Sequence, residues 1–119
     1  MRVSKEFTFE AAHSLPSAPA GHKCRRLHGH SFRVVVHVDG EPDPAMHWVV
    51  DFGDIAQAFA PLHEKLDHHH LNEIEGLENP TSEVLAVWIW ERLSDALPGL
   101  AQVDVKETCT TSCSYRGRR

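Results

Sequence analysis

The sequence predicts an α+β fold in which one antiparallel sheet carries two helices on the same face, in the chain order ββααββ. Apolar and polar residues alternate in two stretches near the N-terminus, which is typical of half-buried strands. Apolar residues then recur at helical spacing in two central segments, and the alternation returns near the C-terminus. A chain of 119 residues is long enough for one core, so we expect a single domain over residues 1–119.

The first two strands are predicted over residues 3–13 and 28–38. The odd positions of the first stretch form its apolar face and end at His13. A loop rich in proline and glycine separates the stretches. In the second, alternate positions from residue 28 read His, His, Phe, Val, Val and Val, so both histidines continue the apolar face. An antiparallel hairpin would direct all three imidazoles to the same side of the sheet.

A first amphipathic helix is predicted after a turn-rich segment at 40–44 and a short apolar run at 48–52, which we expect to be extended. The helix begins at Asp54, and its apolar positions are Ile55, Phe59, Leu62 and Leu66. Pro61 stands in its middle, where the missing N–H removes one helical hydrogen bond. We therefore expect a helix with a local irregularity.

A second helix and two strands complete the predicted order. Residues 79–83 supply N-cap side chains and a first-turn carboxylate, and apolar residues at helical spacing continue to Ala96. Residues 101–108 alternate as a strand, and Glu107 falls on its apolar face. A short last strand is expected near residues 112–116.

Composition argues against several classes of partner. The formal charge is -5 and the basic residues form no extended patch, so we expect no nucleic-acid partner. No apolar run reaches about 18 residues and no signal peptide precedes the first strand, so we expect no membrane partner and a cytoplasmic protein. Three cysteines, an odd number, do not form a disulfide framework. Ten histidines in so short a chain are unusual and point to metal binding or catalysis.

The segment from Cys24 to His30 concentrates the candidate metal ligands. His28 and His30 share a face of an extended strand, with Cα atoms roughly 6.5 Å apart, and His13 supplies a third imidazole if the hairpin forms. Three nitrogen ligands with an open fourth position are typical of catalytic zinc. Packed, non-ligating histidines are the alternative, but two buried imidazoles are costly to desolvate without a function. We therefore expect Zn²⁺ as the cofactor.

The residues leave the role of Cys24 open. It is a fourth ligand that closes a structural zinc site, a small buried apolar residue, or a reactive thiolate favoured by the surrounding positive charge. The basic residues Lys23, Arg25 and Arg26 either form a solvated loop or hold an anionic group of the substrate beside the metal.

Two further groups have the chemistry for proton transfer or ligand binding. Asp67 precedes His68, as a carboxylate that orients an imidazole would, although the residues alone favour a polar surface loop over 67–70. Glu107 either turns to solvent or accepts two N–H donors from a flat heterocycle. The remaining cysteines, Cys109 and Cys113, complete no second metal site and are expected to be structural.

Five stretches of the chain together resemble the 6-pyruvoyl-tetrahydropterin synthase family. They cover nearly the whole chain, at residues 7–13, 21–30, 66–69, 77–83 and 106–109. The three residues between Cys24 and His28 resemble the carboxy-forming bacterial branch, which serves queuosine biosynthesis, whereas the pyruvoyl-forming animal enzymes have a longer gap.

The resemblance implies a role for each matching residue. The zinc ligands would be His13, His28 and His30, and Cys24 would be the general base rather than a ligand. A proton relay would form from Asp67 and His68, and Glu107 would anchor the pterin ring. Two family positions near the pterin pocket match Thr81 and Ser82. As candidates to bind the triphosphate group of the substrate we name Lys23 and Arg26.

The resemblance also implies an assembly and a reaction. The family has the tunnelling fold, in which sheets join into a trimeric barrel and two trimers stack as a hexamer, which covers the exposed sheet edges of a lone subunit. The implied reaction converts 7,8-dihydroneopterin triphosphate to 6-carboxy-5,6,7,8-tetrahydropterin, with release of triphosphate and acetaldehyde. The alternatives are 6-pyruvoyl-tetrahydropterin formation and a non-catalytic, zinc-stabilised pterin-binding module.

Overall fold

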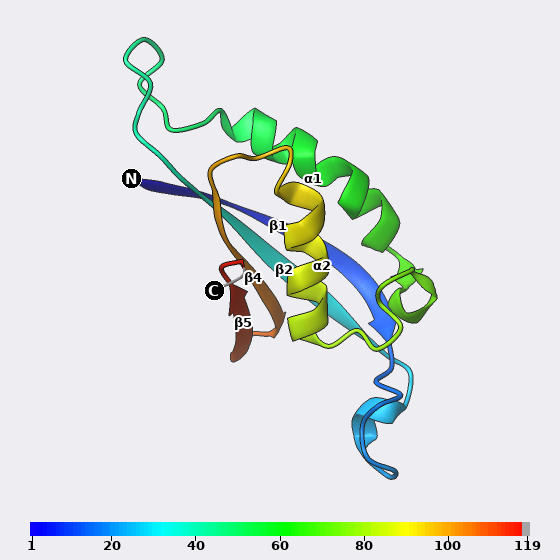
Figure 1. Ribbon diagram of the computed structural model, residues 1–119. Coiled ribbons are helices and arrows are strands. Elements are labelled where there is room, and N and C mark those ends of the chain that lie inside the picture. The colour runs from blue at the N-terminus through cyan, green and yellow to red at the C-terminus, as the bar shows by residue number, and fades with distance from the viewer. Residues whose placement is uncertain (118–119) are drawn as a thin grey trace.

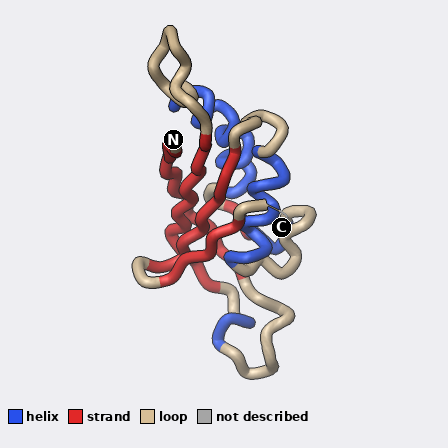
Figure 2. The backbone as a smooth tube through the Cα atoms, turned by 60° about the vertical axis from the view of Figure 1, so that its left-hand side comes forward, coloured by secondary structure: helices blue, strands red, loops and turns tan. Residues whose placement is uncertain are grey.

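The computed structural model describes residues 1–117 and shows a five-stranded sheet with two helices packed against one face (Figure 1). The elements follow along the chain as β1 (Arg2–His13), β2 (His28–Asp39), α1 (Phe52–Leu66), β3 (His69–His70), α2 (Ser82–Leu93), β4 (Leu100–Thr108) and β5 (Thr111–Tyr115), with 3₁₀ turns at Lys23–Arg25 and Leu71–Glu73. The strands lie in the order β3-β1-β2-β4-β5. Figure 2 shows both helices on the same side of the sheet, as the sequence predicted.

The short strand β3 was not predicted. It replaces the expected polar loop, so the order along the chain is ββαβαββ rather than ββααββ. Its two residues pair in parallel with Ala11 and Ala12 of β1. The edge of β1 offers backbone N–H and C=O groups that need partners, and a segment of two residues is enough to supply them locally.

The ends of both helices also differ from the predictions. The run at 48–52 is not a strand, and α1 begins at Phe52 because the side chain of Asp51 caps it by accepting from the Gly53 N–H, at 2.8 Å. Helix α2 ends at Leu93 instead of continuing to Ala96. Pro61 lies within α1 at an exposed position, and the helix continues through it to Leu66.

The two long strands form an antiparallel hairpin whose helix-facing side chains build the core. In this register Ala11 lies opposite His30 and His13 lies opposite His28. Phe9 and Phe32 are almost fully buried and their rings stack with centroids 5.0 Å apart. The apolar face of the hairpin therefore continues directly into the three histidines.

Within residues 1–117, no helix is long and apolar enough to cross a membrane, and the cytoplasmic location stays a prediction.

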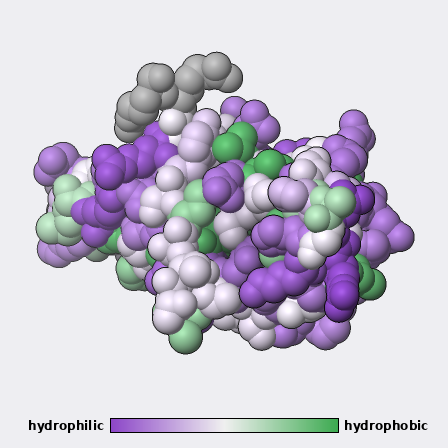
Figure 3. All heavy atoms as spheres, turned by 90° about the horizontal axis from the view of Figure 1, so that it is seen from below, coloured by the Kyte–Doolittle hydropathy of each residue, from purple (hydrophilic) through white to green (hydrophobic). Residues whose placement is uncertain are grey.

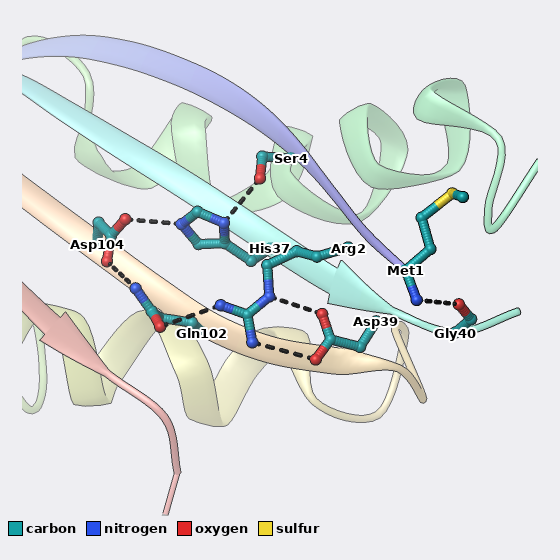
Figure 4. A network of polar contacts seen from close by, with 8 residues as sticks. All are labelled: Met1, Arg2, Ser4, His37, Asp39, Gly40, Gln102 and Asp104. Carbon is teal, nitrogen blue, oxygen red and sulfur yellow. Dashed lines mark hydrogen bonds and ion pairs between the residues drawn. The ribbon is translucent and has the colours of Figure 1, made fainter.

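The opposite face of the sheet is polar and carries a network of hydrogen bonds across β1, β2 and β4 (Figure 4). His37 lies at its centre, with Nδ1 at 2.7 Å from the Ser4 hydroxyl and Nε2 at 2.6 Å from a carboxylate oxygen of Asp104. Gln102 donates to the other oxygen of Asp104, and Arg2 donates to Gln102. These contacts align the three strands at the end of the hairpin remote from the histidines.

Candidate active site

The three predicted imidazoles meet where the β1–β2 hairpin ends. The ring centroids of His13 and His28 lie 4.6 Å apart, those of His28 and His30 lie 4.9 Å apart, and those of His13 and His30 lie 5.3 Å apart. One possible ligand atom from each ring lies within 4.8 Å of the others. Such a cluster has the arrangement of side chains that converge on one metal ion.

Backbone carbonyls orient two of the three rings. Nδ1 of His13 lies 2.9 Å from the carbonyl oxygen of Pro80, and Nδ1 of His28 lies 2.7 Å from that of Arg26. A carbonyl oxygen only accepts, so each Nδ1 carries the proton and donates it. Nε2 of both rings is then free to bind a metal. Hydrogen bonds of this kind are the usual partners of metal-ligating histidines.

The environment of His13 fits a metal ligand. The residue is fully buried, and within residues 1–117 its Nε2 has no hydrogen-bond partner. Burial lowers the pKa of His13, against smaller opposing effects of the Pro80 carbonyl and Glu107, so the ring is neutral near pH 7. A buried, unpaired ring nitrogen is costly unless something binds it. Three imidazole nitrogens are a donor set that suits zinc.

A pocket of about 490 Å³ opens beside the three histidines. Besides the three imidazoles, its walls comprise Leu15, Lys23, Cys24, Arg26, Leu27, Glu107 and Thr108. The predicted thiol, basic side chains and carboxylate thus surround the candidate metal site. Glu107 projects toward it, with Oε1 at 3.8 Å from Nε2 of His13.

Figure 3 views the molecule from the end that carries residues 14–27, where hydrophilic residues dominate the surface and apolar residues form separate patches.

Local hydrogen bonds fix the backbone around Cys24. Its carbonyl accepts from the Leu15 N–H at 2.7 Å, and its own N–H donates to Nδ1 of His22 at 3.0 Å. The first bond ties the 3₁₀ turn at Lys23–Arg25 to the segment that follows β1. The thiol therefore lies on a short turn held against the end of the hairpin that bears the histidines.

Asp67 and His68 face each other at the edge of β1. Asp67 Oδ2 lies 2.9 Å from Nδ1 of His68, while its Oδ1 accepts from the Glu10 N–H at 2.9 Å. The hydrogen bond from Glu10, followed by that from His68, lowers the pKa of Asp67, so the carboxylate stays ionised. His68 also donates its N–H to the Glu10 carbonyl and adopts the left-handed backbone conformation, with φ of 58°. A non-glycine residue there is strained and held by its surroundings.

His68 lines a different pocket from Cys24. His68 lines a cavity of about 530 Å³ together with Glu10, Gly29, Ser31 and the β3 histidines. His30 is the residue that lines both pockets. Of the residues predicted to act together, the structure therefore groups the three histidines with Cys24, Lys23, Arg26 and Glu107, and separates Asp67 and His68 from them.

Thr81 and Ser82 do not line the pocket of Cys24. The Thr81 hydroxyl instead accepts from the Val84 N–H at 3.1 Å and caps α2. Sequence reasoning missed Pro80, which contacts His13 through its backbone carbonyl. Every residue has such a carbonyl, so the residue type at this position does not indicate the contact.

The fold and the grouped residues define a metal-dependent enzyme built on an antiparallel sheet. The sequence profile described as 6-pyruvoyl tetrahydropterin synthase matches residues 2–118. The chain therefore belongs to the 6-pyruvoyl tetrahydropterin synthase family, and it has the tunnelling fold that the sequence predicted.

Individual relatives agree with this assignment. The chain is 46% identical to the 6-carboxy-5,6,7,8-tetrahydropterin synthase of Synechocystis, over 95% of this chain and 91% of that protein. It is 36% identical to the dihydroneopterin monophosphate aldolase of Pyrococcus furiosus, over 82% of this chain and 79% of that protein. The solved 6-pyruvoyl tetrahydropterin synthase of Caenorhabditis elegans superposes with a TM-score of 0.91 at 25% identity, covering 99% and 96% of the two chains.

The cluster predicts a metal site that depends on each histidine. We expect His28→Ala to weaken binding of Zn²⁺ at least about 100-fold, because changing even the hydrogen-bond partners of metal ligands costs about 10–100-fold. Competition with a coloured chelator measures this affinity. The control is His47→Asn, which replaces an exposed loop histidine and suits its left-handed backbone, with φ of 65°. Equal zinc affinity of the wild-type and His28→Ala proteins would contradict the site.

Proposed function

We propose that this protein is a zinc-dependent lyase that converts 7,8-dihydroneopterin triphosphate and one water molecule to 6-carboxy-5,6,7,8-tetrahydropterin in queuosine synthesis, releasing triphosphate and acetaldehyde. The observation that carries the proposal is the shared pocket of Cys24, Glu107 and the three histidines. The name of the Synechocystis relative, a 6-carboxy-5,6,7,8-tetrahydropterin synthase, supports the same product. The three-residue gap between Cys24 and His28 supports it independently.

The three histidines would hold the metal, for which we propose zinc because all three candidate ligands are imidazole nitrogens. When bound, zinc supplies Lewis-acid chemistry that makes removal of a proton from the hydroxylated side chain feasible near pH 7. The Pro80 and Arg26 carbonyls keep the ligand nitrogens of His13 and His28 directed into the site.

The other pocket residues would remove the proton, orient the pterin ring and attract the triphosphate. The Cys24 thiolate takes a proton from the substrate side chain at Sγ, because it lies in the same pocket as the metal ligands. The Glu107 carboxylate accepts two N–H donors of the pterin ring and so sets its orientation. The cationic side chains of Lys23 and Arg26 lie in the same walls and attract the triphosphate.

Asp67 and His68 would exchange the complementary proton. The ionised Asp67 carboxylate holds the N–H at Nδ1 of His68, which leaves Nε2 to donate or accept a proton. Because His68 lines a different pocket from Cys24 in one chain, we propose that another copy of the chain brings the Asp67–His68 pair to the substrate. The edge strands β3 and β5 give each chain two sheet edges for such an assembly, which we propose to be a hexamer of two trimers.

The main alternative is formation of 6-pyruvoyl-tetrahydropterin at the same site. The superposition on the Caenorhabditis elegans synthase favours it, although the two chains share 25% identity against 46% with the Synechocystis relative. The two reactions differ in their products, since pyruvoyl formation retains all the side-chain carbons and releases no acetaldehyde. A non-catalytic pterin-binding module would turn over nothing.

Incubation with 7,8-dihydroneopterin triphosphate tests the proposed reaction. We expect mass spectrometry to identify 6-carboxy-5,6,7,8-tetrahydropterin, triphosphate and acetaldehyde in equal amounts. Cys24→Ala should lower turnover by about 10²–10⁴-fold, the usual contribution of a general base, and leave bound zinc unchanged. The matched control is Cys109→Ala, which removes an exposed thiol outside the pocket. Detection of a pyruvoyl product would overturn the proposed reaction in favour of 6-pyruvoyl-tetrahydropterin formation. Loss of zinc from the Cys24→Ala protein would show that Cys24 is a metal ligand.

Sharing of the site between copies predicts complementation. Cys24→Ala and His68→Asn proteins should each be inactive, whereas oligomers assembled from a mixture of the two should turn over substrate. In such oligomers some sites receive an intact Cys24 from one chain and an intact His68 from another. Asparagine is chosen at position 68 because it tolerates the left-handed backbone. A mixed assembly that stays inactive would contradict a site built from two copies.

A further inference from the structure

Asn72 has no role in the proposed reaction, yet it makes three hydrogen bonds beside the metal cluster. It lies in the 3₁₀ turn at Leu71–Glu73. Its Oδ1 accepts from the Ser14 N–H at 2.9 Å, and its Nδ2 donates to the Ser14 carbonyl at 2.8 Å and to the Glu78 carbonyl at 3.1 Å. Both N–H groups of the amide are therefore used, and the pattern fixes which atom is oxygen and which is nitrogen.

The two bonds to Ser14 fix the backbone that carries His13. Ser14 is the residue after His13, where β1 has ended and the chain enters the loop over residues 14–27. These groups lie just beyond the pairing of β1 with β3, which within the described residues stops at Ala12 and His70. Asn72 binds both the N–H and the carbonyl of Ser14, as a neighbouring strand would.

The third bond fixes the acceptor of the His13 ring. Glu78 lies two residues before Pro80, whose carbonyl accepts the N–H at Nδ1 of His13. The Asn72 amide thus joins the backbone of Ser14, next to His13, to the segment whose Pro80 carbonyl orients the His13 ring. The amide side chain is half-buried, and its neighbour Leu71 is fully buried.

We propose that Asn72 is a positioning residue for the metal ligand His13, acting through the backbone of Ser14 and the segment from Glu78 to Pro80. The inference rests on the proposed zinc site at the three histidines. Zinc binds best when its ligands are already oriented, and partners that orient a ligand affect affinity about 10–100-fold.

Replacement of Asn72 tests the proposal through zinc affinity, without an activity assay. We expect Asn72→Ala to weaken binding of Zn²⁺ about 10–100-fold in competition with a coloured chelator. The matched control is Gln102→Ala, which removes another hydrogen-bonded side-chain amide, one that donates to Asp104 at 2.7 Å and accepts from Arg2 at 3.3 Å, at the end of the hairpin remote from the histidines. We expect the control to bind zinc within about threefold of wild type, because distant sites act independently.

Asn72→Asp provides a second variant of the same size. The carboxylate still accepts from the Ser14 N–H but loses both donor bonds and repels the carbonyls of Ser14 and Glu78. Zinc affinity should therefore fall about 10–100-fold here too, and the Co²⁺ absorption spectrum of the substituted protein should change in shape. Circular dichroism of the metal-free proteins verifies folding, and if the alanine variant does not fold, Asn72→Asp decides.

Two results would overturn the proposal. Zinc affinity of a folded Asn72 variant equal to wild type would remove the positioning role, and an equal loss in Gln102→Ala would assign the effect to general loosening of the fold. Failure of the zinc site itself is recognised separately. In that case wild type and His28→Ala bind zinc alike, whatever the behaviour of the Asn72 variants.

Discussion

The single register of β1 against β2 determines where the metal cluster lies. Side chains alternate along a strand, so a slip of one residue would turn His28 and His30 to the opposite face of the sheet, away from His13. Burial of the apolar face prevents this slip, because Phe32, which stacks on Phe9 beneath the helices, would move to the polar face with the two histidines. The packing that stabilises the fold therefore also brings the ligands together.

The rest of the site depends on the same hairpin. Glu107 enters the pocket from β4, which pairs with β2 in a register that continues the core face through Val103 and Val105. The turn that carries Cys24 is tied to the segment after β1 through Leu15. On the outer edge of β1, the backbone of Glu10 holds Asp67 and His68. Each functional group thus takes its position from one of these two strands or from a direct neighbour.

Much of this arrangement could be predicted from the sequence, because alternation and helical spacing directly report which side chains are buried. His28 and His30 could be assigned to one face from alternation alone, whereas His13 joined them only on the assumption that the two strands pair as a hairpin. The sequence could not reveal β3, because a pair of residues is too short to show a period. Nor could it separate Asp67 and His68 from the Cys24 pocket, since adjacency along the chain says nothing about which side of the sheet a loop reaches. The contacts of Pro80 and Asn72 were hidden because they involve backbone groups.

The proposed site requires coordination of zinc by three imidazoles, with the Cys24 sulfur left free to act as a base. X-ray absorption at the zinc edge of the purified wild-type protein distinguishes the possible ligands, because sulfur and nitrogen neighbours differ in distance. We expect nitrogen or oxygen neighbours at about 2.0–2.1 Å, with the outer-shell pattern of imidazole rings. A sulfur neighbour at about 2.3 Å would contradict this coordination, because Cys24 would then complete a closed structural site.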